Sequence, residues 1–229
     1  MKDIQNHPPI MFQGQVVSDK PEMKLLGVSF SRKLEWKTHL KNITRTAGQR
    51  TSMLRRLGPV FDKAGPVTIY KTYIRSKMEY APLSWMGAST VHLSALDKIQ
   101  RRACRLIGLG PEEQLRHNLS SLSHRRNVAA ASCLYRMQCI KCHTLLKSLV
   151  PPVRQPAARL TRQSLLLNRY SLQSPVPQGM TASRTLRSFD RAFLPAAVKI
   201  WNSLPSSVIS DITTQGMQSF KCRVNKYLK

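Results

Sequence analysis

The chain has 229 residues, 41% of them hydrophobic, which suits one sizeable domain or two small ones and excludes a disordered composition. Lys and Arg number 37 against 11 Asp and Glu, so the formal net charge is +26, and no apolar run is long enough for a transmembrane helix. So much positive charge predicts a polyanionic partner, with nucleic acid first and an anionic membrane surface second.

Short strands are expected at the N-terminal end. Apolar residues flank Gly14, and a polar turn at residues 19–21 leads to the apolar segment 25–30, so we expect two short strands around a turn. From about Glu35 the apolar spacing becomes helical. The predicted fold class is therefore mainly α with a short N-terminal β-hairpin.

Helices follow along most of the chain, each ended by glycine or proline. Four are expected, from about Glu35 to Gly58, from Gly65 to Pro82, from Leu93 to Gly108, and from near Ser123 to Pro151. The next segment holds five prolines and several arginines with little periodicity, which predicts a loosely ordered basic connector. Two more helical patterns close the chain, one containing Phe193 and the other Phe220.

Two of these helices carry basic residues at helical spacing. In the third helix, cations at positions i, i+3, i+4 and i+7 lie opposite the apolar residues and are spaced to follow a phosphate backbone. The first helix has a similar set. A merely solvated face normally mixes in acids, and acids are nearly missing here, so the pattern favours contact with nucleic acid. The two sets are Lys98, Arg101, Arg102 and Arg105, and Lys37, Lys41, Arg45, Arg55 and Arg56.

The cysteines suggest haem or zinc chemistry at first sight. Residues 139–143 match the C-x-x-C-H pattern of haem attachment, and with Cys133 they offer four metal-ligand side chains. The motif falls within a predicted helix and lacks a second ligand pair from another element, so we interpret these side chains as structural. Five cysteines make no disulfide framework, and the N-terminus lacks an apolar signal segment. An intracellular location, nucleus or cytoplasm, is expected.

No active site is recognised in the sequence. The phosphate-binding, zinc-protease and serine-hydrolase motifs are absent, and only Glu112 and Glu113 are adjacent acids, whereas two-metal catalysis needs converging carboxylates. Trp36 and Trp201 fall on apolar stripes and are expected in the core, not stacked on bases; Trp85 follows a proline break and is left unassigned. No catalytic residue, metal ligand or cofactor is predicted.

Short motifs along nearly the whole chain resemble one family. They are Leu26-Gly27-Val28, Leu34 to Leu40, Tyr70 to Tyr80 with Trp85 after it, Leu96 to Ala103, Leu149 to Pro152, Arg191 to Pro195, Trp201 to Pro205, and Phe220-Lys221. In this combination and order they resemble the region after the catalytic motif of non-LTR retrotransposon (jockey/CR1-like LINE) reverse transcriptases. Each motif is short, and the specificity lies in the set.

The resemblance implies the end of the palm, the thumb and a C-terminal extension. The implied parts are end-of-palm strands similar to the primer grip (1–32), a thumb-like helical bundle (33–110), a long helix (111–150), the connector (151–185) and a C-terminal helical extension (186–229). The catalytic Tyr-x-Asp-Asp motif would lie before residue 1. The chain is therefore expected not to be an enzyme, and resembles a truncated reading frame or a domain cut from a longer protein.

The expected function is sequence-independent binding of RNA, an RNA/DNA hybrid or a DNA duplex by its backbone, with no membrane and no small-molecule substrate. The predicted contacts are Lys37, Lys41, Arg45, Arg55, Arg56, Lys71, Arg75, Lys98, Arg101, Arg102 and Arg105, with Lys24, Leu26 and Gly27 as primer-grip-like residues. Two alternatives stay open. The chain could be a structural piece that is inert without a separate palm and fingers polypeptide, or a degenerate relic that folds poorly.

Overall fold

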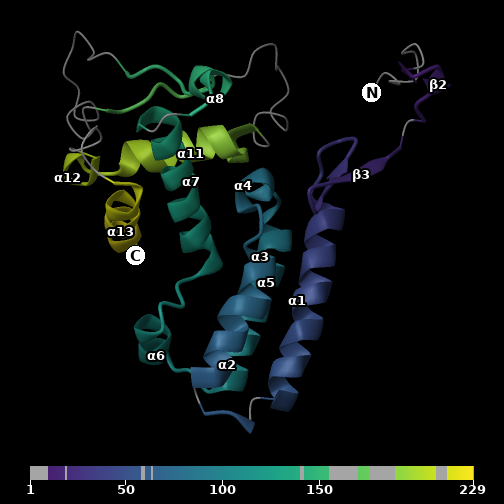
Figure 1. The fold of residues 1–229 in the computed structure, drawn as a ribbon. Coiled ribbons are helices and arrows are strands. Elements are labelled where there is room, and N and C mark those ends of the chain that lie inside the picture. The colour runs from purple at the N-terminus through teal and green to yellow at the C-terminus, as the bar shows by residue number, and fades with distance from the viewer. Residues whose placement is uncertain are drawn as a thin grey trace.

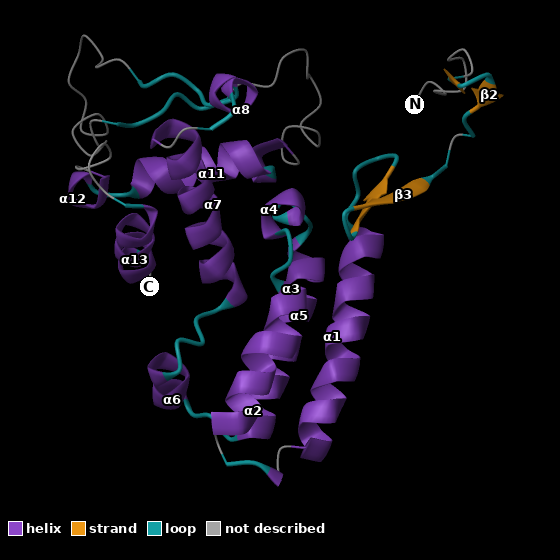
Figure 2. Ribbon diagram, in the orientation of Figure 1, coloured by secondary structure: helices purple, strands orange, loops and turns teal. Residues whose placement is uncertain are grey.

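A computed structural model describes residues 10–18, 20–57, 60–62, 64–139, 142–154, 170–175, 189–209 and 216–228. In these ranges the protein is mainly α, with small antiparallel hairpins at its N-terminal end (Figures 1 and 2). The predicted fold class is confirmed. The described N-terminal residues form two hairpins, however, where one was expected.

Both hairpins have two-residue turns. The strands are β1 (Met11–Phe12) with β2 (Gln15–Val16), and β3 (Glu22–Leu25) with β4 (Val28–Ser31). Both central residues of each turn have positive φ, 47° and 78° at Gln13 and Gly14, and 47° and 82° at Leu26 and Gly27. Such turns match the right-handed twist of paired strands. The polar residues near Pro21 thus connect two hairpins and do not form the turn of one.

The first hydrophobic core lies among the helices that follow. These are α1 (Lys37–Leu57), α2 (Ala64–Ile69), the π-helix η3 (Tyr70–Arg75), α3 (Ser76–Met78), α4 (Pro82–Trp85) and α5 (Thr90–Ile107). α1 and α5 run side by side along the α2–η3–α3 segment (Figure 1). Leu40, Ala47, Ile74, Leu96 and Ala103 are among the buried residues. The predicted first and third helices are confirmed, including their ends at Leu57 and Ile107.

The second core is built from the C-terminal half. The helices of this half are α6 (Pro111–Arg116), α7 (Leu122–Cys139), α8 (Thr144–Ser148), α11 (Phe193–Ser203), α12 (Ser206–Ile209) and α13 (Met217–Tyr227). Of these, α6 and α8 contribute no buried residue to the core. Tyr135 stacks on Phe220 with ring centroids 4.2 Å apart, and Trp201 lies 5.8 Å from Phe220. α4 lies between the cores, because Trp85 belongs to the first while Leu83 packs against the second.

The long helix predicted from Ser123 to Pro151 is wrong at its C-terminal end. α7 ends at Cys139, and the short α8 follows. Cys142 and His143 lie between these helices, and Leu145, expected on the buried stripe, is exposed. Apolar spacing continues through the break, but an amphipathic helix depends on a partner surface for most of its stability. Tyr73, Leu106 and Tyr227, also expected to point inward, are exposed.

Candidate nucleic-acid interface

Helix α5 separates its charged and apolar side chains onto opposite faces. Leu96, Ile99, Gln100, Ala103, Cys104 and Ile107 are buried, whereas Lys98, Arg101, Arg102 and Arg105 are exposed. At 100° per residue, the four cations centre on the side opposite the buried residues. In the described part of the chain no carboxylate lies within 4.0 Å of any of them. We call these four residues the α5 basic face.

Helix α1 adds a second exposed basic set. Lys37, Lys41 and Arg45 follow one another along the helix at intervals of four, and Arg55 and Arg56 lie in its last turn. All five are exposed, as predicted. Basic residues in a last turn also interact favourably with the helix dipole, so Arg55 and Arg56 have a local structural role as well.

The predicted contacts in the π-helix lie in other surroundings. Lys71 is half-buried. The Arg75 side chain is only 15% exposed, its Nε is 3.9 Å from Glu79, and burial lowers the pKa of Arg75. Arg75 therefore belongs to an interior charge cluster with Glu79 and Arg125, separate from the exposed basic faces. The sequence alone did not separate it from the exposed cations, because Arg75 and Lys98 both lie on helical segments with apolar neighbours.

The primer-grip-like residues lie in the second hairpin. Lys24 is exposed on β3, and Leu26 and Gly27 form the turn. The hydroxyl of Tyr80 donates to the carbonyl oxygen of Leu26 over 2.8 Å, and a Cβ added to Gly27 would lie 3.4 Å from the Tyr80 ring. The tip of this hairpin is therefore attached to the helical body through Tyr80, a contact that the sequence did not reveal.

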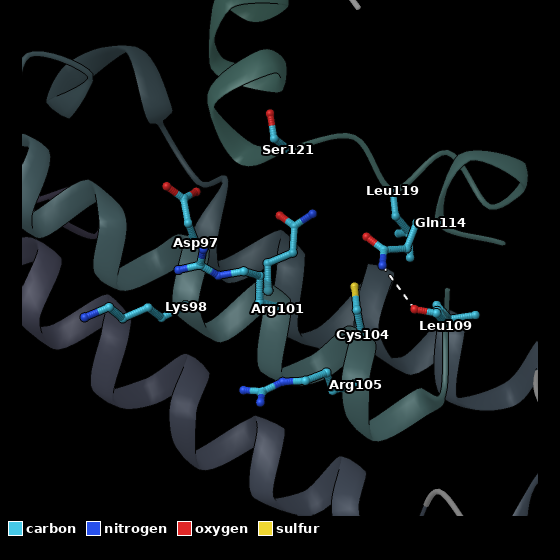
Figure 3. A pocket seen from close by; sticks show the side chains of 10 residues that line it. Asp97, Lys98, Arg101, Cys104, Arg105, Leu109, Gln114, Leu119 and Ser121 are labelled. Carbon is cyan, nitrogen blue, oxygen red and sulfur yellow. Dashed lines mark hydrogen bonds between the residues drawn. The ribbon is translucent and has the colours of Figure 1, made fainter. Parts of the chain in front are cut away.

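A groove of about 780 Å³ runs beside α5 (Figure 3). Lys98, Arg101 and Arg105 border it and extend to the same side of α5 in that view, while Leu109, Gln114 and Leu119 line it from the segment that follows α5. Arg102 does not line the groove. Sequence reasoning missed this feature, because the lining residues from 109 to 121 carry no motif and come together only through the turn at Gly108.

Neutral side chains also line the groove. Cys104 is 3% exposed, and burial raises the pKa of its thiol, which therefore stays protonated at neutral pH. The Gln114 side-chain amide donates to the Leu109 carbonyl oxygen over 3.1 Å, and the Gln100 amide donates to the Ser120 carbonyl oxygen over the same distance. The second bond holds the connection between α5 and α7 against α5, and the first lies within that connection.

The described residues of the cysteine motif form no metal site. Cys142 and His143 follow the end of α7, so the interpretation of both as residues within a helix is wrong. The His143 ring instead accepts the Leu145 N–H over 3.3 Å, which caps α8. Within the described ranges no group of three or more His, Cys, Asp or Glu side chains could hold a metal ion.

The tryptophans are core residues. Trp201 is fully buried and Trp36 packs against the first core at an edge-on angle to Phe30, so the predicted placement of both is confirmed. Trp85, which the sequence left unassigned, is also fully buried, and its ring nitrogen donates to the Tyr80 carbonyl oxygen over 3.1 Å. Trp85 and Trp201 therefore have no exposed ring face for base stacking.

No protein-family model, curated protein or solved structure matches the chain. Over the described residues, no helix has both the length and the apolar character needed to cross a membrane.

Proposed function

We propose that the protein binds the phosphate backbone of a nucleic-acid duplex through the α5 basic face, with the exposed cations of α1 as additional contacts. The observation that carries the proposal is the α5 basic face itself, whose four cations are exposed and lack a carboxylate within 4.0 Å in the described ranges. Cations of this kind bind a polyanion by releasing its condensed counterions, which makes binding independent of base sequence.

The spacing of the α5 basic face suits a nucleic-acid strand. Seven residues separate Lys98 from Arg105, which is roughly 10 Å along the helix axis at ~1.5 Å per residue. On a duplex this length covers about three nucleotides of one strand. The face can therefore contact consecutive phosphates without distortion of the helix.

The same arrangement is unfavourable for the isolated helix. Like charges three and four residues apart destabilise a helix by a few tenths of a kcal/mol per pair, roughly. In α5 no acid at these spacings lies beside Arg101, Arg102 and Arg105 to offset this cost, apart from Asp97 on the turn before. A bound polyanion would remove the repulsion, so binding and helix stability support each other.

By the family resemblance, we propose that the chain is the thumb and C-terminal extension of a non-LTR retrotransposon reverse transcriptase, and that it has no polymerase activity of its own. The hairpin attached to Tyr80 would then correspond to the primer-grip-like strands. In this proposal the duplex lies along α5 and α1, and the palm that holds the catalytic residues is a separate part.

One observation favours the alternative of a structural piece that works only with a palm. The N-terminal hairpins expose many apolar side chains, and in Figure 1 the first hairpin extends away from the helices. The exposed residues are Ile10, Met11, Phe12, Val16, Val17, Met23, Leu25 and Leu26. Exposed apolar strands of this kind are typical of a surface that pairs with another protein segment.

A salt titration tests the proposal. The purified chain is titrated into a labelled RNA/DNA primer–template duplex at several salt concentrations, and binding is followed by fluorescence anisotropy. Four phosphate contacts on α5 predict a log–log slope near −4, and further contacts on α1 make it steeper. Replacing Arg101, Arg102 and Arg105 by Glu should make the slope shallower by about three units and weaken binding to every sequence alike.

A matched control separates the effect of the α5 basic face on binding from the effect of the total charge. Replacing Arg116, Lys147 and Lys226 by Glu changes the net charge by the same amount at exposed positions on α6, α8 and α13. This control should bind nearly as the natural chain does. Equal losses in both triple variants would contradict the assignment to α5. Failure of the folded natural chain to bind would favour the structural piece, and absence of a cooperative thermal transition by circular dichroism would favour the relic.

A further inference from the structure

We infer that the groove beside α5 holds one unpaired nucleotide of the nucleic acid bound on the α5 basic face. The inference rests on the proposed function and deepens it, because it assigns the single-stranded part of a primer–template to a definite place. The groove is large enough for the purpose, since its volume of about 780 Å³ lies within the usual range of small-ligand sites.

The groove has two chemically distinct sides, which match the two halves of a nucleotide. Lys98, Arg101 and Arg105 supply positive charge along one border. Leu109 and Leu119, each nearly buried, and the neutral Cys104 thiol supply apolar surface. A phosphate is an anion that suits the first side, and the flat face of a base suits the second.

Hydrogen-bond acceptors on the groove add to this match. The Gln114 amide and the Asp97 carboxylate both line the groove, and Figure 3 shows them on different sides of it. Their oxygens can accept the N–H groups on a base edge. In a duplex those edges are occupied by pairing, so only an unpaired base offers them together with an open ring face.

An acidic peptide fits less well. It would satisfy Lys98, Arg101 and Arg105, but its Asp and Glu side chains supply no flat apolar group for the surface formed by Leu109 and Leu119. The position of Arg102 supports the nucleotide as well. Because Arg102 lies outside the groove, it can stay on the duplex backbone while the cations that border the groove also contact the first phosphate of an overhang.

The test compares three labelled RNA/DNA duplexes of equal length by anisotropy: a blunt one, one with a three-nucleotide overhang, and one with a three-residue abasic overhang of the same charge. The natural chain should bind the overhang duplex about fivefold tighter than the blunt one, which is the low end of what one well-packed base contributes. The abasic overhang should give little of this gain, because it adds phosphates without bases.

Variants on α6 test whether the tighter binding of the overhang duplex depends on the groove; this difference is called the gain. Gln114→Trp fills the groove and should abolish the gain while leaving blunt-duplex binding unchanged. Leu115→Trp adds the same ring at an exposed neighbouring position outside the groove and should keep it. Gln114→Ala removes the side-chain amide and its hydrogen bond to Leu109 without filling the groove, and should lower the gain only in part.

The outcomes separate the two proposals. Salt-dependent binding of the blunt duplex with no gain from the overhang would overturn the groove inference and leave the proposed function intact. A gain that the abasic overhang reproduces, or that survives Gln114→Trp, would overturn it too. Absence of blunt-duplex binding by the folded chain would overturn the proposed function, and the groove inference with it.

Discussion

Both carboxylate oxygens of Glu79 accept hydrogen bonds from the guanidinium group of Arg125, Oε1 from Nε and Oε2 from Nη2, the latter over 2.8 Å. Glu79 follows α3 in the first core, and Arg125 lies near the start of α7, which packs in the second. The pair therefore ties the two cores together. The hydrogen bond that Arg125 donates to Glu79 also raises the pKa of Arg125, which stays charged.

Glu79→Gln should destabilise the protein by about 2 kcal/mol, because it leaves the charges of Arg75 and Arg125 partly buried without a counter-ion. Arg75 already has a buried Nη1 with no hydrogen-bond partner. Urea denaturation gives the free energy of unfolding. Asp190→Asn is the matched control, because Asp190 lies 4.0 Å from Lys199 in a pair whose side chains are more than half exposed. A loss for Glu79→Gln no larger than for Asp190→Asn would contradict the proposed link.

Gly87→Ala should destabilise the protein by roughly 1–3 kcal/mol through overpacking. A Cβ at Gly87 would lie 2.8 Å from the carbonyl oxygen of Arg191, and backbone at this contact has little freedom to move aside. Gly48→Ala in the middle of α1 is the control, and for this variant we expect a gain in stability. No heavy atom lies within 4 Å of the added Cβ, so the better helix propensity of alanine should raise stability by about 0.5–1 kcal/mol. In thermal melts, Gly87→Ala should lower the melting temperature and Gly48→Ala should raise it.

Asn202→Asp should weaken the attachment of the segment around Leu172. The Leu172 N–H donates to Asn202 Oδ1 over 2.8 Å, and Asn202 Nδ2 donates to the Leu172 carbonyl oxygen over 2.9 Å. Aspartate keeps the acceptor but loses the donor and places a charge beside the carbonyl oxygen, which should cost about 1–3 kcal/mol. Limited proteolysis should cut faster near Leu172. Ser203→Ala, next to it on the exposed side of α11, should leave the cleavage rate unchanged.

Stability should fall in mild acid because of His39. Its ring Nδ1 accepts the Ser29 N–H over 3.2 Å, and burial, helped by the charge of Lys77, lowers the pKa of His39 below its ordinary value of 6.5. Above pH 6.5 this contribution is fully present, because both folded and unfolded states are neutral. As the pH falls below that value the unfolded state binds the proton first, so stability is lost until the pH passes the folded-state pKa.

His39→Asn provides the comparison, because its side-chain oxygen can accept the same N–H and does not titrate. Urea midpoints measured between about pH 8 and about pH 5 should fall further for the natural chain than for the variant. Parallel curves would show that His39 does not couple the hairpin β3–β4 to pH. The remaining histidines are common to both proteins and cancel in the difference.

Apolar periodicity predicts helix α5 correctly, but it does not predict where α7 ends. In α5 the apolar residues repeat over five turns and the cations occupy the opposite side, so both the buried stripe and the basic face follow from spacing alone. From Ser123 to Leu149 the spacing continues equally well, yet the helix stops at Cys139. An apolar stripe supports one continuous helix only where another surface covers it, and Leu145 and Leu149 are exposed.

The sequence by itself determined the helical class, the C-terminal ends of α1 and α5, and the exposure of the cations predicted on both helices, because these depend on neighbours three and four residues away. Only the tertiary structure decided that Arg75 pairs with Glu79 in the interior, that Tyr80 holds the Leu26 turn, and that residues 109–121 form a groove with α5. These features join segments up to 54 residues apart. Local periodicity carries no information at that distance, because it records which face of a helix is buried and not what lies against it.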